Sequence, residues 1–395
     1  MGVKRKKYKR LLDLPLSGDH SIFLFGPRGC GKSFWLKENL KSPFVYIDLL
    51  DTEINFDLQV NPSRLKRYIG TDKDAWIVID EVQKIPALLD EVHRLIENDR
   101  RKFILTGSSA RKLRKDSSNL LAGRALTYKM YPLTAVELAE DFDIAKSLQY
   151  GHMPSIYDNN GLDTAKYLES YIKTYLKEEV QQEGLSRNIS AFARFLEIAS
   201  FSQASTLNIS EIAREAALKT TTVSNYFDLI EDMLISYRLP VFTKRAKRRM
   251  IAHPKFFYFD SGIYFNLRPK SILDSIPEAE GASLETLIYQ DLIAINDYYD
   301  LKYKIFYWRT AYGNEVDFIL LGTKKLIAIE AKHSSRVHRK DTKSLKSFKE
   351  DYPEADLYLI YLGSTRQDID GVKVIPATDF LLNLDKFLRR TEKKV

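Results

Sequence analysis

Residues 21–33 read Ser-Ile-Phe-Leu-Phe-Gly-Pro-Arg-Gly-Cys-Gly-Lys-Ser. The apolar run 21–25 predicts a buried strand, and residues 34–40 predict an amphipathic helix. Between them lies the pattern GxxxxGK[ST]. Its glycines let backbone N–H groups face phosphates, Lys32 places a positive charge at the β- and γ-phosphates, and the Ser33 hydroxyl holds Mg²⁺. We therefore expect a P-loop that binds a nucleoside triphosphate, ATP in the first place. The residues expected to contact it are Gly26, Pro27, Arg28, Gly29, Cys30, Gly31, Lys32 and Ser33.

The composition is that of a globular chain with two or three domains. Of the 395 residues 44% are hydrophobic and 29% are charged, and the net charge of +8 favours polyanions such as nucleic acid or an anionic membrane surface. The sequence shows no secretory signal and no run of about 18 apolar residues, so we expect no membrane partner. One cysteine, Cys30, fits a reducing cytoplasm and is expected to be a small buried filler rather than an oxidation site.

A second apolar run, at 75–79, ends in Asp80-Glu81. We expect Asp80 to hold Mg²⁺ through water and Glu81 to orient and polarise the attacking water, which is the work that a phosphate site still needs once the phosphates are clamped. The alternative is that both acids cap the next helix. A third strand, 102–105, leads into Thr106-Gly107-Ser108-Ser109, where Ser108 is expected to contact the γ-phosphate or its water unless it is a simple turn residue.

Strands that alternate with helices predict a P-loop αβα sandwich with the nucleotide at the carboxyl ends of parallel strands. The order of P-loop, Asp80-Glu81, polar Ser108 and Gly123-Arg124 resembles an AAA-type ATPase module. That resemblance implies that Arg124 reaches the nucleotide of a neighbouring subunit, in a ring-shaped homo-oligomer with a hexamer favoured. The alternative for Arg124 is a surface pair with a local carboxylate.

The middle of the chain predicts two further parts. Residues 134–189 are mainly helical and resemble an ATPase lid, in which His152 has no chemical role. Helices at 208–216 and 220–231, followed by strands at 234–242 and 256–260, predict a winged helix-turn-helix with a basic wing. The residues expected to contact DNA are Thr221, Thr222, Ser224, Asn225, Lys244, Arg245, Lys247, Arg248 and Arg249. The alternative is that the winged helix binds protein and that the charged residues 244–249 are simply exposed to solvent.

Beyond residue 275 a helix and three strands carry four polar residues. Glu285 lies on the helix 281–289, Asp317 on the strand 315–321, and Glu330 and Lys332 share one face of the last strand. This resembles the PD-(D/E)xK nuclease core, which implies a second Mg²⁺ at the acids and a lysine that positions hydroxide. The alternative is a buried ionic network without cleavage. The nearby His333 and His338 are expected to face phosphates rather than a metal.

From end to end the chain resembles a prokaryotic family of AAA-type (AAA+) ATPases with a C-terminal domain of unassigned function. The stretches that carry this resemblance are 26–33, 80–83, 106–109, 123–124, 307–309 and 315–318. The expected domains are an ATPase core at 1–133, a lid at 134–189, a winged helix-turn-helix at 190–270 and a restriction-endonuclease-like α/β domain at 271–395.

The function expected first is an ATPase that remodels or translocates on DNA. One alternative is an ATP-gated, Mg²⁺-dependent DNA nuclease of a defence or mobile-element system. Another is an ATP-dependent regulatory switch that binds protein.

Overall fold

The computed structural model describes residues 6–41, 43–109, 120–158, 163–175, 188–244, 253–269 and 276–393. They form two compact units. The first contains the described residues of Leu12–Pro132 together with Asp232–Leu234, and the second contains those of Met1–Leu11, Leu133–Glu231 and Ile235–Val395. Each unit is described on its own.

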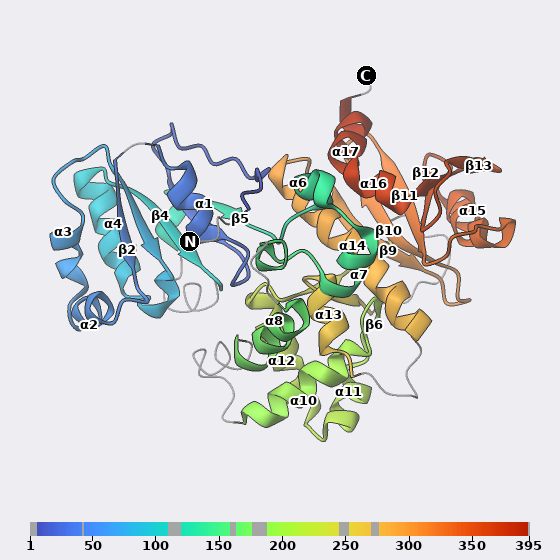
Figure 1. Cartoon of the computed structure of the whole chain (residues 1–395), viewed down its shortest axis with the longest axis horizontal. Coiled ribbons are helices and arrows are strands. Elements are labelled where there is room, and N and C mark those ends of the chain that lie inside the picture. Colours follow the sequence, from blue (N-terminus) through green and yellow to red (C-terminus); the bar gives the residue numbers. More distant parts are fainter. Residues whose placement is uncertain are drawn as a thin grey trace. The chain divides into compact units, whose positions relative to one another are not determined.

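The first unit is built on a fully parallel sheet of order β2-β3-β4-β1-β5. Its strands are β1 (Ser21–Phe25), β2 (Phe44–Asp48), β3 (Trp76–Asp80), β4 (Lys102–Gly107) and β5 (Ala125–Lys129). The helices between them are α1 (Lys32–Asn39), α2 (Thr52–Val60), α3 (Leu65–Tyr68) and α4 (Leu88–Asp99) (Figure 1). β1, β3 and β4 are almost wholly buried, which explains why they read as continuous apolar runs. The α/β fold with a parallel sheet is therefore confirmed.

The second unit begins with helices and a small sheet. Its first helices are α6 (Ala135–Leu138), α7 (Ile144–Tyr150), α8 (Thr164–Ser170) and α10 (Ile189–Ser200). The predicted helix 135–141 ends early and continues as a 3₁₀ turn, and the predicted helix 177–183 lies outside the described residues. Next come β6 (Ser205–Thr206), α11 (Ile209–Ala216), α12 (Thr220–Asp232), β7 (Ser236–Leu239), β8 (Lys255–Tyr258) and α13 (Ser261–Leu267). The three strands pair antiparallel in the order β6-β8-β7.

The rest of the second unit is a six-stranded mixed sheet of order β13-β14-β12-β11-β10-β9. Its strands are β9 (Lys304–Arg309), β10 (Glu315–Leu321), β11 (Leu326–Lys332), β12 (Asp356–Tyr361), β13 (Gln367–Ile369) and β14 (Val372–Pro376). Its helices are α14 (Ile276–Tyr298), α15 (Lys343–Asp351), α16 (Ala377–Leu382) and α17 (Leu384–Lys393) (Figure 1). Alternate residues of β10 enter two cores, since Phe318 packs with Leu287 of α14 and Ile319 packs with Phe348 of α15.

The amino-terminal segment belongs to this second unit, although the sequence placed it with the ATPase core. Tyr8 donates a hydrogen bond of 2.7 Å to Asp141. Arg10 pairs with Glu137 at 2.9 Å, and both side chains are nearly inaccessible. The physical reason is charge, because a buried glutamate needs a cation and Arg10 supplies it. The regions predicted as lid, winged helix-turn-helix and nuclease-like domain also lie together in this one compact unit.

Candidate functional site

The loop between β1 and α1 has the geometry that its glycines predict. Gly29 and Gly31 have φ values of 82° and 98°, in the left-handed region that side chains disfavour. At Gly26 a Cβ would lie 2.2 Å from the backbone oxygen of Met130, so this position has no room for a side chain. Lys32 is 5% exposed and donates to the backbone oxygens of Gly26 (2.7 Å) and Pro27 (3.2 Å). The loop is thus held in a turn whose backbone and ammonium suit phosphates.

Asp80, at the end of β3, is surrounded by hydroxyl groups. Ser33 Oγ donates to its Oδ2 at 2.6 Å, and the Tyr46 hydroxyl donates to the same oxygen. Thr106 donates to Oδ1 from the end of β4. Burial, and then the hydrogen bond to Asp80, raise the pKa of Tyr46 well above its ordinary range, so this phenol stays a donor. The two residues expected to hold Mg²⁺, Ser33 and Asp80, are therefore brought together, although their motifs lie far apart in the sequence.

Glu81 follows directly and has a left-handed backbone with φ of 61°. Such a conformation is uncommon for a residue other than glycine and is often found at functional sites. Its N–H donates to Thr106 Oγ1 at 3.2 Å. The Gln83 side-chain amide donates both to Glu81 Oε2 and, at 3.0 Å, to Ser108 Oγ. Gln83 thus links the expected water-orienting acid to the expected γ-phosphate contact.

Tyr46 and Gln83 contact the predicted site residues although no motif in the sequence predicted a role for them, and Thr106, expected among the short polar side chains at the γ-phosphate, contacts Asp80 and the Glu81 N–H. Tyr46 lies on β2, at the sheet edge beside β3, where only the register reveals it. Thr106 and Gln83 lie in the motifs that contain Ser108 and Glu81. Their polar side chains, two residues from these predicted site residues, are the feature of the sequence that could have indicated their contacts. Cys30 is fully buried, which agrees with its expected role as a filler.

Arg124 precedes β5 and pairs through Nε with Glu97 of α4 in the same chain. Its side chain is 37% exposed. This is the local carboxylate pair that the sequence left open as the alternative to an arginine finger. Because a surface pair of this kind is weak, it does not bar Arg124 from another partner.

The residues expected to contact DNA are described only in part. On α12, Thr221 and Asn225 are exposed, and Thr222 and Ser224 are half-buried. Lys244 is exposed, and the remaining predicted wing cations lie outside the described residues: Arg245, Lys247, Arg248 and Arg249.

The four polar residues predicted for the C-terminal domain also come together, beside a buried lysine that the sequence did not suggest. Lys255 of β8 is 1% exposed, and its Nζ lies 3.2 Å from Glu285 Oε2, 2.5 Å from Glu315 Oε1 and 3.1 Å from Asp317 Oδ1. Burial alone would lower the pKa of Lys255, but Glu285, Asp317 and Glu315 together raise it well above its ordinary range. In the sequence, Lys255 could have been recognised as a buried lysine because it stands in the otherwise apolar run 255–259. We call Lys255, Glu285, Glu315, Asp317, Glu330 and Lys332 the acidic centre.

Lys332 and Glu330 complete the acidic centre. Lys332 Nζ lies 2.6 Å from Glu330 Oε1, while Glu330 Oε2 is buried without a hydrogen-bond partner. Burial, and then the charge of Asp317, raise the pKa of Glu330 to about 8. Within the part of the chain that the structure describes, no group of three or more His, Cys, Asp or Glu side chains is arranged to hold a metal ion. The predicted second Mg²⁺ site therefore stays a prediction.

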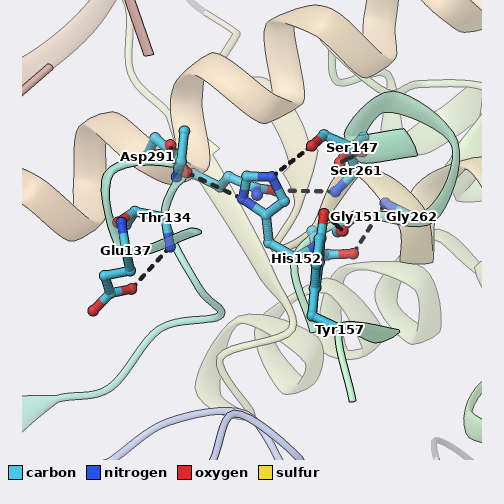
Figure 2. A network of polar contacts seen from close by, with 12 residues as sticks. Thr134, Glu137, Ser147, Gly151, His152, Tyr157, Ser261, Gly262 and Asp291 are labelled. Carbon is cyan, nitrogen blue, oxygen red and sulfur yellow. Dashed lines mark hydrogen bonds and ion pairs between the residues drawn. The ribbon is translucent and has the colours of Figure 1, made fainter. Parts of the chain in front are cut away.

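A buried polar network lies around His152 in the second unit (Figure 2). The ring contacts Ser147 Oγ at 2.9 Å through Nε2 and faces Asp291 Oδ1 at 3.6 Å through Nδ1. This order of groups occurs in hydrolases, but the three side chains are at most 1% exposed, so no substrate reaches them. The backbone N–H of His152 donates to Asp260, which also caps α13. The network ties α7, α13 and α14 together.

Family models match three parts of the chain. Residues 19–139 match an AAA domain. This match lies mainly in the first unit and includes the P-loop. Residues 141–272 and 280–380 match two domains of unknown function, DUF8612 and DUF4143. The match to an AAA domain supports the AAA-type ATPase that the sequence predicts, whereas the two other matches carry no activity.

Relatives along most of the chain are uncharacterised proteins. One from Mycobacterium tuberculosis is 25% identical over 371 residues, which cover 91% of this chain and 80% of the relative. Another, from Methanocaldococcus jannaschii, is 24% identical and covers 82% of this chain and 77% of the relative. Among solved structures, the Aeropyrum pernix ORC1 protein in complex with DNA is 13% identical with a TM-score of 0.25, covering 63% of this chain and 86% of that one. Protein VC1899 of Vibrio cholerae is 13% identical with a TM-score of 0.23, covering 94% and 97%. Structural likenesses this weak support no conclusion.

Among the described residues, no helix is long and apolar enough to cross a membrane.

Proposed function

We propose that this chain hydrolyses ATP in its AAA domain and uses the energy to act on DNA, as a homo-oligomer. The observation that carries the proposal is the arrangement at the ends of β3 and β4. There Asp80 contacts Ser33, while Glu81 and Ser108 share the amide of Gln83. A site that only binds nucleotide needs the P-loop, whereas hydrolysis also needs an acid beside the γ-phosphate.

The residues present fit Mg²⁺-ATP. The backbone N–H groups of Gly29–Ser33 and the Lys32 ammonium would hold the phosphates, with Ser33 and Asp80 at the metal. Mg²⁺, when bound, neutralises the charge that develops on the phosphate oxygens. Glu81 would orient the attacking water and accept its proton. Gln83 would hold Glu81 and Ser108 at a fixed separation, so that the base and the polar contact act on the same phosphate.

The DNA part of the proposal is supported by the elements from α10 to β8. The order α10, β6, α11, α12, β7, β8, with the strands pairing as β6-β8-β7, fits the proposed winged helix-turn-helix. α12 would be the recognition helix, with Thr221 and Asn225 exposed at its amino-terminal end. The sequence between β7 and β8 contains five Lys and Arg residues at 244–249, which suit phosphate contacts.

Assembly into a ring, with a hexamer favoured, is proposed from Arg124. Its position before β5 is the one from which the AAA resemblance expects an arginine to reach a neighbouring subunit's nucleotide. Opening the exposed pair with Glu97 costs little, since such pairs contribute at most about 1 kcal/mol.

DNA binding is tested by titrating fluorescent duplex, forked and four-way DNA at several salt concentrations, with and without a non-hydrolysable ATP analogue. We expect affinity to fall steeply with salt and to depend on nucleotide. Combined Lys247→Ala, Arg248→Ala and Arg249→Ala substitutions should lower the salt slope by about 0.9 for each lost phosphate contact. The matched control is Lys166→Ala with Lys173→Ala, because these lysines of the α8 region are 82% and 66% exposed. Salt-independent or absent binding to all three DNA structures contradicts the DNA part and leaves the ATPase intact.

A further inference from the structure

Lys255 lies at the point where the carboxylates of the C-terminal sheet converge. Its partners come from different elements: Glu285 from α14, and Glu315 and Asp317 from the start of β10. An ammonium that is 1% exposed would be strongly destabilising without partners, and three carboxylates within 3.2 Å supply them. The ammonium is therefore the positive charge around which these acids gather.

The resemblance to PD-(D/E)xK nucleases implies a metal at Glu285, Asp317 and Glu330, but the residues present do not fit one, and Glu285 Oε2 already faces the Lys255 ammonium at 3.2 Å. Asp317 directs Oδ1 at Lys255 Nζ, and its Oδ2 accepts from the Ala331 N–H at 2.9 Å. Glu330 is engaged by Lys332 through Oε1. A divalent cation at Glu285 Oε2 or Asp317 Oδ1 would have to displace the tethered Lys255 ammonium from its buried position.

We propose that the Lys255 ammonium takes the place of a divalent cation in the acidic centre, and that this centre holds the stem of the basic segment instead of cutting DNA. The stem consists of the described residues 240–244 and 253–255, on either side of 245–252. This proposal does not depend on the proposed ATPase cycle.

The stem is fixed to the C-terminal sheet at several further points. On the side that follows β7, Phe242 is buried in the core that contains Trp308 and Phe348, and its N–H donates to the Tyr307 oxygen at 2.6 Å. Tyr352 donates from its hydroxyl to the backbone oxygen of Lys244 at 2.8 Å. These contacts fix residues 242–244 of the stem to the C-terminal sheet.

On the side that leads into β8, the Tyr307 hydroxyl donates to the backbone oxygen of His253, two residues before Lys255. Tyr307 therefore contacts both sides of the stem, since its N–H donates to the Pro240 oxygen at 3.0 Å. Lys255 adds a charged contact on this side, and its removal takes the cation away from Glu285 and Asp317, while Glu315 keeps its pair with Arg309 at 3.3 Å.

The first test uses Mn²⁺ as a probe and counts bound Mn²⁺ by electron paramagnetic resonance, on the full chain without nucleotide. Wild type and Asp317→Asn should bind the same number of ions, because Lys255 already fills the acidic centre. Mn²⁺ binding by the wild type that is lost in Asp317→Asn would overturn the proposal.

The second test removes the ammonium. Lys255→Met should lower the Tm by on the order of 10 °C. Added Mn²⁺ should restore much of this loss of Tm by taking the place of the ammonium. In the double variant Lys255→Met/Asp317→Asn, Mn²⁺ should not restore the Tm. The matched control is Lys332→Met, which removes a lysine of the same centre whose side chain is 38% exposed and should create no Mn²⁺ response. No Mn²⁺ response in a folded Lys255→Met, or an equal response in Lys332→Met, contradicts the assignment. If Lys255→Met does not fold, the wild-type count decides.

Discussion

Ser33 Oγ donates a 2.6 Å hydrogen bond to Asp80 Oδ2, and this contact joins the P-loop to the end of β3. The two residues are the expected Mg²⁺ partners of a P-loop ATPase, and they meet because β4 alone separates β1 from β3 in the sheet. Glu81, one residue further, leaves the strand with a left-handed backbone that Thr106 supports through its hydroxyl. The geometry therefore places two acids where the proposed roles, one at Mg²⁺ and one at the attacking water, require them.

Replacement of Glu81 by Gln separates ATP binding from hydrolysis. The amide cannot accept the proton of the attacking water, so we expect kcat to fall about 10²- to 10⁴-fold while the Kd for ATP stays within a few fold. Lys32→Ala is the comparison, because it removes a phosphate contact and should weaken binding itself. Steady-state hydrolysis and equilibrium binding of a fluorescent ATP analogue measure the two effects. Unimpaired turnover in Glu81→Gln would assign the base elsewhere.

Thr106→Val tests how Asp80 and Glu81 are held. The substitution removes the donor to Asp80 and the acceptor of the Glu81 N–H, so we expect a kcat about 10- to 100-fold lower and a loss of about 1–3 kcal/mol of stability. Tyr46→Phe removes a single contact to Asp80 and should cost less in both measurements. Hydrolysis rates and urea unfolding of the two variants show which substitution has the larger effect on kcat and on stability. Equal effects of the two substitutions would contradict this account of Asp80.

Arg124→Ala tests the proposed finger. A finger supplied to a neighbouring subunit is worth orders of magnitude in rate, so turnover should fall at least about 100-fold with ATP binding unchanged. Glu97→Gln removes the in-chain partner and leaves the arginine, so it should retain most of the activity. If both variants lose activity alike, Arg124 acts through its pair with Glu97 and not through a neighbour.

Stability should depend on pH through Glu330. Its pKa is about 8 in the folded chain against an ordinary 4.5, so between these values the folded state holds a proton that the unfolded state has lost. Folding is therefore favoured by this group below about pH 5, and the benefit, on the order of a few kcal/mol, is lost as pH rises through 8. Glu330→Gln should flatten the dependence. Urea unfolding of both proteins at pH 5, 6.5 and 8 checks this, and parallel curves would contradict it.

The sequence predicts the parts of the site whose signal is local. The P-loop, Asp80, Glu81 and Ser108 each lie at a strand end with a characteristic pattern, so strand assignment alone positions them. Other contacts depend on which strands are neighbours. Tyr46 reaches Asp80 only because β2 pairs with β3, and no spacing in the sequence states that pairing.

The acidic centre shows the same limit over longer distances. Side chains alternate between the two faces of a strand, and this alternation correctly predicts that Glu330 and Lys332 lie on the same face of β11. Asp317 lies beside them because β10 pairs with β11. Lys255 enters from β8, a strand of another sheet, so that a predicted metal site contains a lysine ammonium. The amino-terminal segment is another case in which a contact between residues far apart in the sequence decides the structure. Arg10 belongs to the second unit because it pairs with the buried Glu137.

If ATP hydrolysis by this chain drives work on DNA, then DNA should change the rate of hydrolysis, and steady-state hydrolysis with and without DNA measures that change. We predict that duplex, forked or four-way DNA raises the turnover of the wild type at low salt. Higher salt should weaken this stimulation, and Glu81→Gln should show no turnover with or without DNA. Wild-type turnover that no DNA changes at any salt concentration would contradict the claim.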